Sequence, residues 1–318
     1  MKRLLTVCAA ALAAARLAAP AAAQVNGKVI YGRDDRIDVY QTDSAKLKSL
    51  ADSTVALFYS GDVEVQGGKA QLATRVYGDS MRLCNQEPFF DQPTGAFCSG
   101  ALVAPDVIMT AGHCVTSIDA CKDIKFVFGF AINKKGQDAT NVSADDAYGC
   151  KELIGREQVN NGADWALVRL NRRVAGHKPL KLNLAGKIDK DAPIFVIGHP
   201  SGLPTKIAGG AYVRASSNPG FFVANLDTYG GNSGSAVFNA ETNLVEGILV
   251  RGDQDFTLDP IGQCQFSRRC ADDACRGEDV TKIANVSDKI PVAEHKTRAA
   301  EIDRVTATLA ALGVETRP

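Results

Sequence analysis

Short β-like runs spread along most of the chain are the feature that most constrains its fold. They are rich in β-branched and aromatic residues, and Gly, Pro, Asn and Asp separate them. The runs cover residues 54–59, 101–103, 107–110, 124–130, 165–170, 194–197, 236–238 and 244–250. This pattern predicts an all-β body of the barrel or sandwich type.

Only two segments carry a helical pattern. Residues 44–50 predict a short helix, and residues 297–312 place apolar side chains at spacings of three and four. Gly313 follows the second segment, where a helix stop is expected. We therefore expect an all-β body with a C-terminal helix.

The first 23 residues have the form of a signal peptide. Lys2 and Arg3 precede an apolar run over 4–15, and three alanines at 21–23 precede Gln24. The apolar run is too short to span a bilayer, and a basic residue at position 16 ends it. The sequence thus predicts export by a Sec-type signal and a mature protein that is secreted or periplasmic, with no membrane association after cleavage.

Export to an oxidising compartment would allow the cysteines to form disulfides. Eight of the nine follow the signal peptide, and an even number in an oxidising compartment predicts up to four disulfides. Those eight are Cys84, Cys98, Cys114, Cys121, Cys150, Cys264, Cys270 and Cys275. A zinc site is the alternative for the last three, but they contain no Cys-x-x-Cys and no paired histidine lies nearby. Residues 253–279, which are polar and hold these three cysteines, predict a disulfide-linked surface insertion, and no metal or other cofactor is expected.

The charge balance argues against nucleic acid as a partner. The chain has 36 basic and 36 acidic residues, and no run of Lys or Arg indicates a nucleic-acid surface. With 45% hydrophobic residues over 318 positions, it can bury a full core.

Three motifs, which follow one another along the chain, indicate a catalytic site. His113 lies in Thr-Ala-Gly-His-Cys after an apolar strand, and Asp164 opens the alternating strand Asp-Trp-Ala-Leu-Val-Arg-Leu. Ser233 lies in Gly-Gly-Asn-Ser-Gly-Ser, a turn of small residues before another strand. Each motif alone has an ordinary structural explanation, but the set fits nucleophilic acyl transfer. The imidazole takes the serine proton, the carboxylate orients the imidazole, and the backbone N–H groups of Gly231 and Ser233 stabilise the oxyanion.

These motifs resemble those of chymotrypsin-fold serine proteases, in the glutamyl-endopeptidase-like bacterial branch. The resemblance rests on the segments 98–100, 110–114, 164–167 and 227–235, and on residues 29–36, which are similar to a mature N-terminus of that branch. It implies two six-stranded antiparallel barrels, with His113 and Asp164 in the first and Ser233 in the second. It also implies a Cys98–Cys114 disulfide. Cys121 and Cys150 flank an expected hairpin, which leaves Cys84 to pair within the 264–275 cluster.

The sequence departs from this family at the specificity site. Asn232 stands where trypsin has an aspartate that pairs with the freed N-terminal amine. Asp227 matches the trypsin S1 aspartate, although an aspartate also recurs there for structural reasons. Leu249 stands near the position of the glutamate-reading histidine, and Arg251 either lines the S1 entrance or neutralises Asp227. His199 is assigned a structural role.

The resulting domain plan has four parts: a signal peptide over 1–23, a short propeptide over 24–28, an N-terminal segment over 29–97, and a peptidase domain over 98–318. The propeptide requires a cut after Lys28; otherwise Gln24 is the mature terminus and residues 29–36 pack as an internal strand.

The predicted function is a monomeric, secreted serine endopeptidase acting on protein or peptide substrates. One alternative is an inert binding protein on the same scaffold. The other is an α/β-hydrolase esterase, but that fold places histidine after serine and needs Gly-x-Ser-x-Gly, whereas here Ser235 replaces the last glycine.

Overall fold

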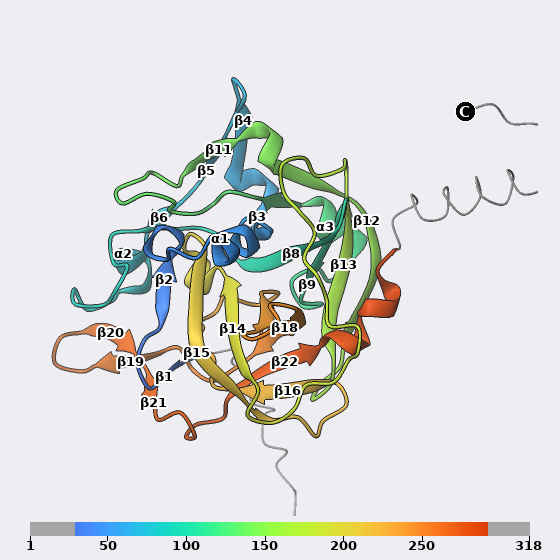
Figure 1. Ribbon diagram of the computed structural model, residues 1–318. Helices are drawn as coiled ribbons and strands as arrows, with labels where there is room; N and C mark the ends of the chain where they lie inside the picture. The colour runs from blue at the N-terminus through green and yellow to red at the C-terminus, as the bar shows by residue number, and fades with distance from the viewer. Residues whose placement is uncertain (1–28, 292–318) are drawn as a thin grey trace, which may run out of the picture.

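The computed structural model describes residues 29–291, which form two β-barrels packed against each other (Figure 1). The first barrel is closed by antiparallel pairing in the order β10-β12-β13-β9-β8-β3. Its strands are β3 (Thr54–Tyr59), β8 (Cys98–Ala104), β9 (Val107–Thr110), β10 (Ile124–Val127), β12 (Ala147–Gln158) and β13 (Asp164–Leu170).

The second barrel has the strand order β14-β17-β18-β22-β16-β15, and antiparallel pairing of β14 with β15 closes the ring. Its strands are β14 (Pro193–Gly198), β15 (Lys206–Ala215), β16 (Phe221–Ala224), β17 (Ala236–Asn239), β18 (Val245–Arg251) and β22 (Glu278–Lys282). A further strand, β2 (Arg36–Asp38), pairs with residues 206–208 at the start of β15. The expected pair of six-stranded antiparallel barrels is confirmed.

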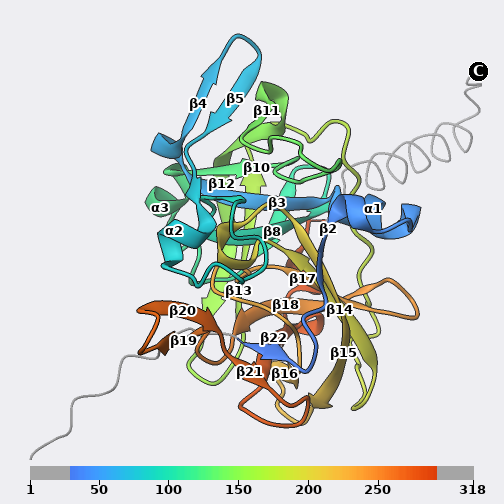
Figure 2. The same ribbon diagram turned by 90° about the vertical axis from the view of Figure 1, so that its left-hand side faces the viewer.

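The remaining strands decorate the barrels. A small sheet of β4 and β5 with β11 projects from the first barrel (Figure 2). The bounds are β1 (Ile30–Tyr31), β4 (Val63–Gln66), β5 (Lys69–Leu72), β6 (Arg75–Val76), β7 (Pro93–Thr94), β11 (Asn141–Ser143), β19 (Phe256–Asp259), β20 (Cys264–Ser267) and β21 (Arg269–Cys270).

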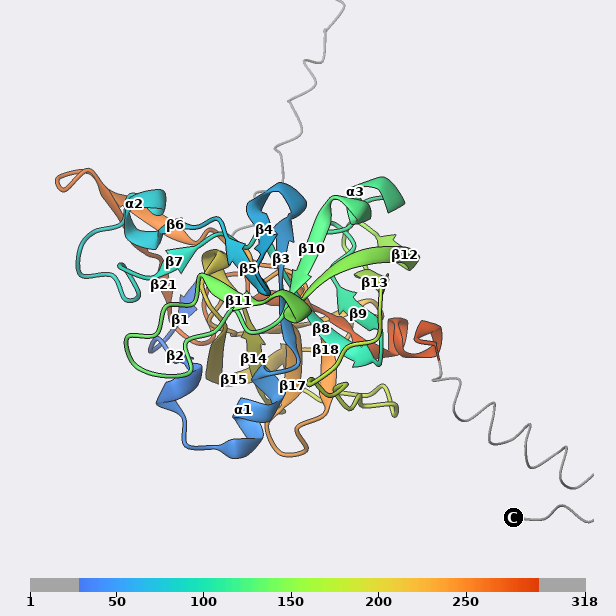
Figure 3. The same cartoon turned by 90° about the horizontal axis from the view of Figure 1, so that it is seen from above.

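The helices are short and lie outside the strands (Figure 3). They are α1 (Ala45–Ala51), α2 (Tyr77–Met81) and α3 (Ile118–Lys122), with 3-10 turns at Val39–Gln41, Ser60–Asp62, Ala144–Asp146, Pro200–Gly202, Ile283–Asn285 and Ser287–Lys289. The predicted helix over 44–50 is confirmed as α1. Ser44 caps it, because its side chain accepts a hydrogen bond from Leu47 N at 3.3 Å. The predicted helix over 297–312 lies outside the described residues.

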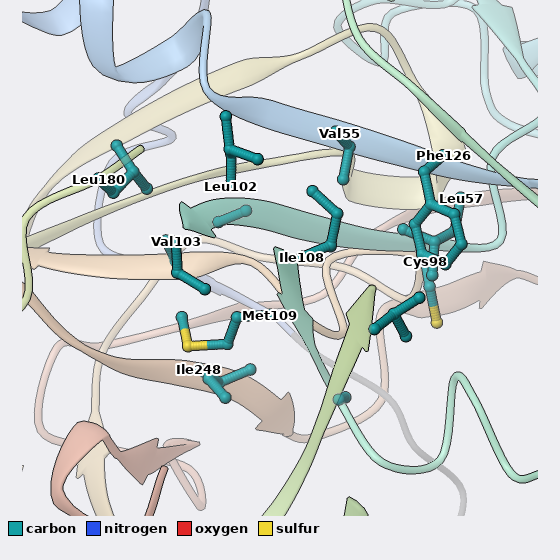
Figure 4. Close-up of a cluster of buried hydrophobic side chains, with 14 of the residues drawn as sticks. Val55, Leu57, Cys98, Leu102, Val103, Ile108, Met109, Phe126, Leu180 and Ile248 are labelled. Carbon is teal, nitrogen blue, oxygen red and sulfur yellow. The ribbon is translucent and has the colours of Figure 1, made fainter. Parts of the chain in front are cut away.

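One apolar core joins the two barrels. The largest buried cluster takes side chains from both, and in Figure 4 Met109 of β9 lies beside Ile248 of β18. Val55, Leu102 and Ile108 line the first barrel in the same cluster, and all three are fully buried. Because burial of apolar area is the main favourable contribution to folding, a shared core opposes movement of one barrel against the other.

The insertion predicted over 253–279 needs correction at its end. Its first part contains the exposed β19–β20 hairpin, as expected. Glu278 and Asp279 belong instead to β22, a buried strand of the second barrel that pairs with β16 and β18. These two charges misled the prediction, because buried acids are tolerated only when they are paired or hydrogen-bonded.

The segment before Cys98 is part of both barrels. It supplies β3 to the first barrel, β2 to the sheet of the second, and β1, which pairs in parallel with β21. Among residues 29–291, no helix is both long and apolar enough to cross a membrane.

Candidate active site

His113 and Asp164 meet at the edge of the first barrel. His113 follows β9 and Asp164 is the first residue of β13, which pairs with β9 along its length. The His113 Nδ1 atom lies 2.8 Å from Asp164 Oδ2, and His113 N donates to Asp164 Oδ1 at 3.1 Å. One carboxylate thus contacts both the ring and the backbone of His113, which fixes the residue and leaves Nε2 as the ring nitrogen available for proton transfer.

Asp164 is itself fixed by β22. Asp164 N donates to Thr281 Oγ1 at 3.0 Å, and the Thr281 hydroxyl donates back to Asp164 O at 3.0 Å. The Asp164 residue is 2% exposed and Thr281 is fully buried. Thr281 is a supporting residue that the sequence analysis missed, because a lone threonine in a strand carries no local signal.

Ser233 lies in the turn before β17, and Ser99 of β8 connects this turn to the first barrel. Ser99 N donates to Ser233 O at 2.8 Å, and Ser99 Oγ donates to Gly231 O at 2.8 Å. Cys114, the neighbour of His113, brings its Sγ within 3.7 Å of Ser233 O. The turn that carries Ser233 is therefore held directly against the strands that carry His113.

The backbone N–H groups of this turn fall into two sets: those that are hydrogen-bonded within the protein and those that can bind an oxyanion. Asn232, Gly234 and Ser235 donate their N–H groups to the carbonyls of Tyr229, Leu249 and Asn232, respectively. Among the described residues, the N–H groups of Gly231 and Ser233 have no protein acceptor. These two are the donors that the sequence analysis assigned to the oxyanion.

Both glycines that flank Ser233 are required by the geometry. Gly231 and Gly234 have φ values of +86° and +93°, which L side chains rarely adopt. A Cβ on Gly234 would come within 2.0 Å of Ser99 O, and one on Gly231 would lie 2.7 Å from His199 O. The turn can therefore pack against β8 and against residues 199–202 only with glycine at these positions.

Four disulfides use all eight cysteines of the described residues, 29–291. They pair Cys98 with Cys114, Cys121 with Cys150, Cys84 with Cys264, and Cys270 with Cys275. The Cys98–Cys114 bridge joins β8 to the residue after His113. Because Cys264, Cys270 and Cys275 are all oxidised, none offers a thiolate, and the zinc alternative is wrong.

Asp227 contacts the N-terminal segment. Its two carboxylate oxygens accept hydrogen bonds from Tyr31 N at 2.7 Å and Asp35 N at 2.8 Å. Burial raises the pKa of Asp227 to about 7, against the lowering effect of these two bonds. Ion pairing with Arg251, one alternative from the sequence, does not occur; residues 29–36 occupy this carboxylate.

Arg251 and Leu249 lie on β18, beside the Ser233 turn. Leu249 is fully buried, and its backbone pairs with Gly234 and Ser235. The Arg251 guanidinium pairs with Asp279 at 3.0 Å and lies 3.8 Å from Asp164 Oδ2. Arg251 thus reaches the carboxylate of the proposed triad, an arrangement that the sequence did not indicate.

A second buried acid next to β18 was also missed. Glu278 is fully buried and accepts a hydrogen bond from Thr228 Oγ1 at 2.9 Å. Its carboxylate is so close to Gly252 that a Cβ there would lie 2.1 Å from Oε2. No sequence motif marks Glu278, because its position depends on the pairing of β22 with β18.

Two further histidines have structural surroundings. His199 is buried, and its Nδ1 donates to Leu203 O at 2.9 Å; burial lowers its pKa to about 4. His177 lies between Asp52 and Asp146, 3.1 and 3.2 Å away, and stacks on Phe128. Burial opposes the charge of His177, but the two carboxylates raise its pKa to about 9.

Comparison with known proteins gives partial matches. Residues 98–248 match the model of the trypsin-like peptidase domain. Proproteinase E of Bos taurus is 32% identical over 111 residues, which are 33% of this chain and 44% of that protein. Human chymotrypsin-like elastase family member 3B is 30% identical over 84 residues, which are 26% of this chain and 31% of that protein. The matched region spans less than half the length of either relative.

Two solved structures of proteases are similar in backbone over most of this chain. A Glu endopeptidase in complex with MPD is 17% identical with a TM-score of 0.46, and the match covers 82% of this chain and 97% of that one. The VesB protease of Vibrio cholerae is 15% identical with a TM-score of 0.48, and the match covers 83% and 67%. Residues 98–248 are thus similar to the trypsin-like peptidase domain, in a chain that folds as two closed antiparallel barrels.

Proposed function

We propose that this protein is a serine endopeptidase, exported from the cytoplasm, that cleaves protein or peptide substrates through an acyl-enzyme on Ser233. The observation that carries the proposal is the joining of two half-sites. The His113–Asp164 pair, at 2.8 Å, belongs to the first barrel, and the Ser233 turn of the second barrel is hydrogen-bonded to that barrel by Ser99.

The mechanism follows from this arrangement. His113 Nε2 accepts the proton of Ser233 Oγ as the oxygen attacks the substrate carbonyl carbon, and the N–H groups of Gly231 and Ser233 bind the resulting oxyanion. When the carbon–nitrogen bond breaks, the imidazolium gives its proton to the leaving amine. Water then attacks the acyl-enzyme, with His113 again as base, and releases the acid and Ser233. Asp164 remains ionised and stabilises the imidazolium in both halves.

Export is part of the proposal and has separate support. Four disulfides persist in oxidising compartments and are rare in the cytosol. The N-terminal signal pattern and its cleavage before Gln24 belong to the same proposal, as does a short propeptide ending at Lys28. Membership of the glutamyl-endopeptidase-like branch also remains a proposal.

The decisive experiment uses a fluorophosphonate probe and a mixed peptide library on the purified secreted protein. We expect covalent labelling of Ser233 and cleavage of peptides, and both should be lost in Ser233→Ala. Turnover should fall on the order of 10⁴-fold or more in that variant, and by about 10⁴ in Asp164→Asn, which favours the wrong imidazole tautomer.

Two outcomes would contradict the proposal. Near-normal turnover in Ser233→Ala would show that another group performs the chemistry. A folded wild-type protein that is neither labelled nor able to cleave any peptide would instead indicate an inert binding protein on this scaffold.

A further inference from the structure

We propose that Arg251 is a positioning residue for the triad: its guanidinium fastens the two barrels together beside Asp164 and holds a positive charge next to the His113–Asp164 pair. This inference rests on the proposed function.

The guanidinium is held at three points. Its Nε donates to Asp279 Oδ2 at 3.0 Å, and its Nη2 donates to Gly162 O at 2.7 Å. Its Nη1 lies 3.8 Å from Asp164 Oδ2, the same oxygen that contacts His113 Nδ1. The Arg251 side chain is only 13% exposed, so these contacts are sheltered from solvent.

The contacts cross the boundary between the barrels. Gly162 lies just before β13 of the first barrel and Asp164 is the first residue of that strand, whereas Asp279 lies on β22 of the second barrel. The proposed triad is divided in the same way, so a small shift of one barrel would separate Ser233 from His113. A planar guanidinium with several fixed donors suits this task better than the single ammonium of lysine.

The other charged groups near Asp164 do not take the place of the Arg251 guanidinium. Asp279 also pairs with Arg276 at 2.6 Å, so two cations share this one carboxylate. From β12, Arg156 donates to Gly112 O at 3.0 Å, and Glu157 accepts from the Trp165 indole at 3.0 Å. Among the arginines and lysines of the described residues, Arg251 is the one that lies within ion-pair distance of Asp164.

A cation at this place has a definite effect on the reaction. It partly offsets the negative charge of Asp164, so it opposes protonation of the imidazole. Removal of this charge is therefore expected to move the acid limb of the kcat/KM profile to higher pH.

The test compares Arg251→Met, Arg251→Gln and Arg251→Lys with wild type, using a peptide substrate found in the library screen. In the Met and Gln variants, we expect kcat to fall about 10-fold with a smaller change in KM. We also expect the acid limb to move up by about 0.5–1 pH unit, as for a unit charge in partly screened surroundings. In Arg251→Lys, the acid limb should return to its wild-type position, because lysine keeps the positive charge. Part of the loss in kcat should remain, because lysine lacks the several fixed donors of the guanidinium.

Arg169→Met is the matched control. Arg169 is also a half-buried arginine, and it pairs with Asp106 and Glu152 at 3.2 and 3.0 Å from the far end of β13. It should lose stability without moving the acid limb. If Arg251→Met does not fold, Arg251→Gln decides the question.

The outcomes separate this inference from the proposed function. A wild-type protein without fluorophosphonate labelling overturns the proposed function. A labelled wild type combined with an unmoved acid limb in Arg251→Gln overturns the role of Arg251 alone, whether or not kcat falls. A shifted limb that lysine restores supports it.

Discussion

Ser99→Ala tests whether the hydroxyl of Ser99 holds the oxyanion donors in place. Ser99 is fully buried, and its Oγ donates to Gly231 O at 2.8 Å while accepting from His199 N at 2.9 Å. The substitution removes both bonds but keeps the backbone bond from Ser99 N to Ser233 O. It therefore frees the peptide that follows Gly231 and leaves the serine itself anchored.

The expected magnitudes follow from these contacts. Two lost hydrogen bonds, one of which leaves a buried N–H without an acceptor, should lower the free energy of unfolding by about 2–4 kcal/mol. Loss of one oxyanion donor costs on the order of 10²–10³ in kcat, and here the Gly231 N–H is displaced rather than removed. We expect kcat to fall about 10- to 100-fold, with KM changed by less than about 2-fold.

The assay combines steady-state kinetics with urea denaturation. Ser44→Ala is the control, because Ser44 also accepts a backbone N–H, at the start of α1, far along the chain from the turn. It should lose about 1 kcal/mol of stability and no activity. Ser99→Ala with wild-type kcat would refute the reasoning, even if its stability fell as expected.

Two further predictions concern stability. His177→Asn should destabilise the protein most below about pH 6.5 and progressively less as the pH rises through about 9, because the raised pKa of His177 makes its charged form stabilising up to that range. Denaturation curves at several pH values check this, and an equal loss at every pH would contradict it. Replacing both cysteines of the Cys84–Cys264 bridge with alanine should cost about 5 kcal/mol, against about 2 kcal/mol for Cys270–Cys275, because the closed loops span 180 and 5 residues. Urea midpoints under non-reducing conditions compare the two, and equal losses would show that loop length is not the cause.

The sequence predicted the parts of the site that are local. His113, Asp164 and Ser233 each stand in a short contiguous motif, and β3 and β9 were predicted with the bounds that the structure has. Strand β12 was missed, because half-buried positions and charges interrupt its pattern. Antiparallel pairing with β10 and β13 makes this segment a strand, and the sequence of the segment alone does not reveal that pairing.

The contacts that support the site could not be read in the same way. Arg251 reaches Asp279 only because β18 pairs with β22, and Ser99 reaches Gly231 across 132 residues of sequence. The contacts of Asp227 with Tyr31 and Asp35 could not be predicted either, because the motif around Asp227 says nothing about the N-terminal segment. Such pairings depend on strand register, which one sequence does not reveal.

The pairing of the N-terminal segment with the last strands has a consequence for when this chain can fold. Ile30 pairs with Arg269, and β22, which ends at Lys282, is needed to close the second barrel. A growing chain therefore lacks the partners for its N-terminal strands until β21 and β22 have left the ribosome. Folds dominated by such distant pairings form slowly. The first barrel, whose strands lie within residues 54–170, can close earlier, but the second barrel cannot close before β22 has been synthesised. Under the proposed export, a chain that crosses the membrane during synthesis would thus do so before the Ser233 turn is held in a completed barrel.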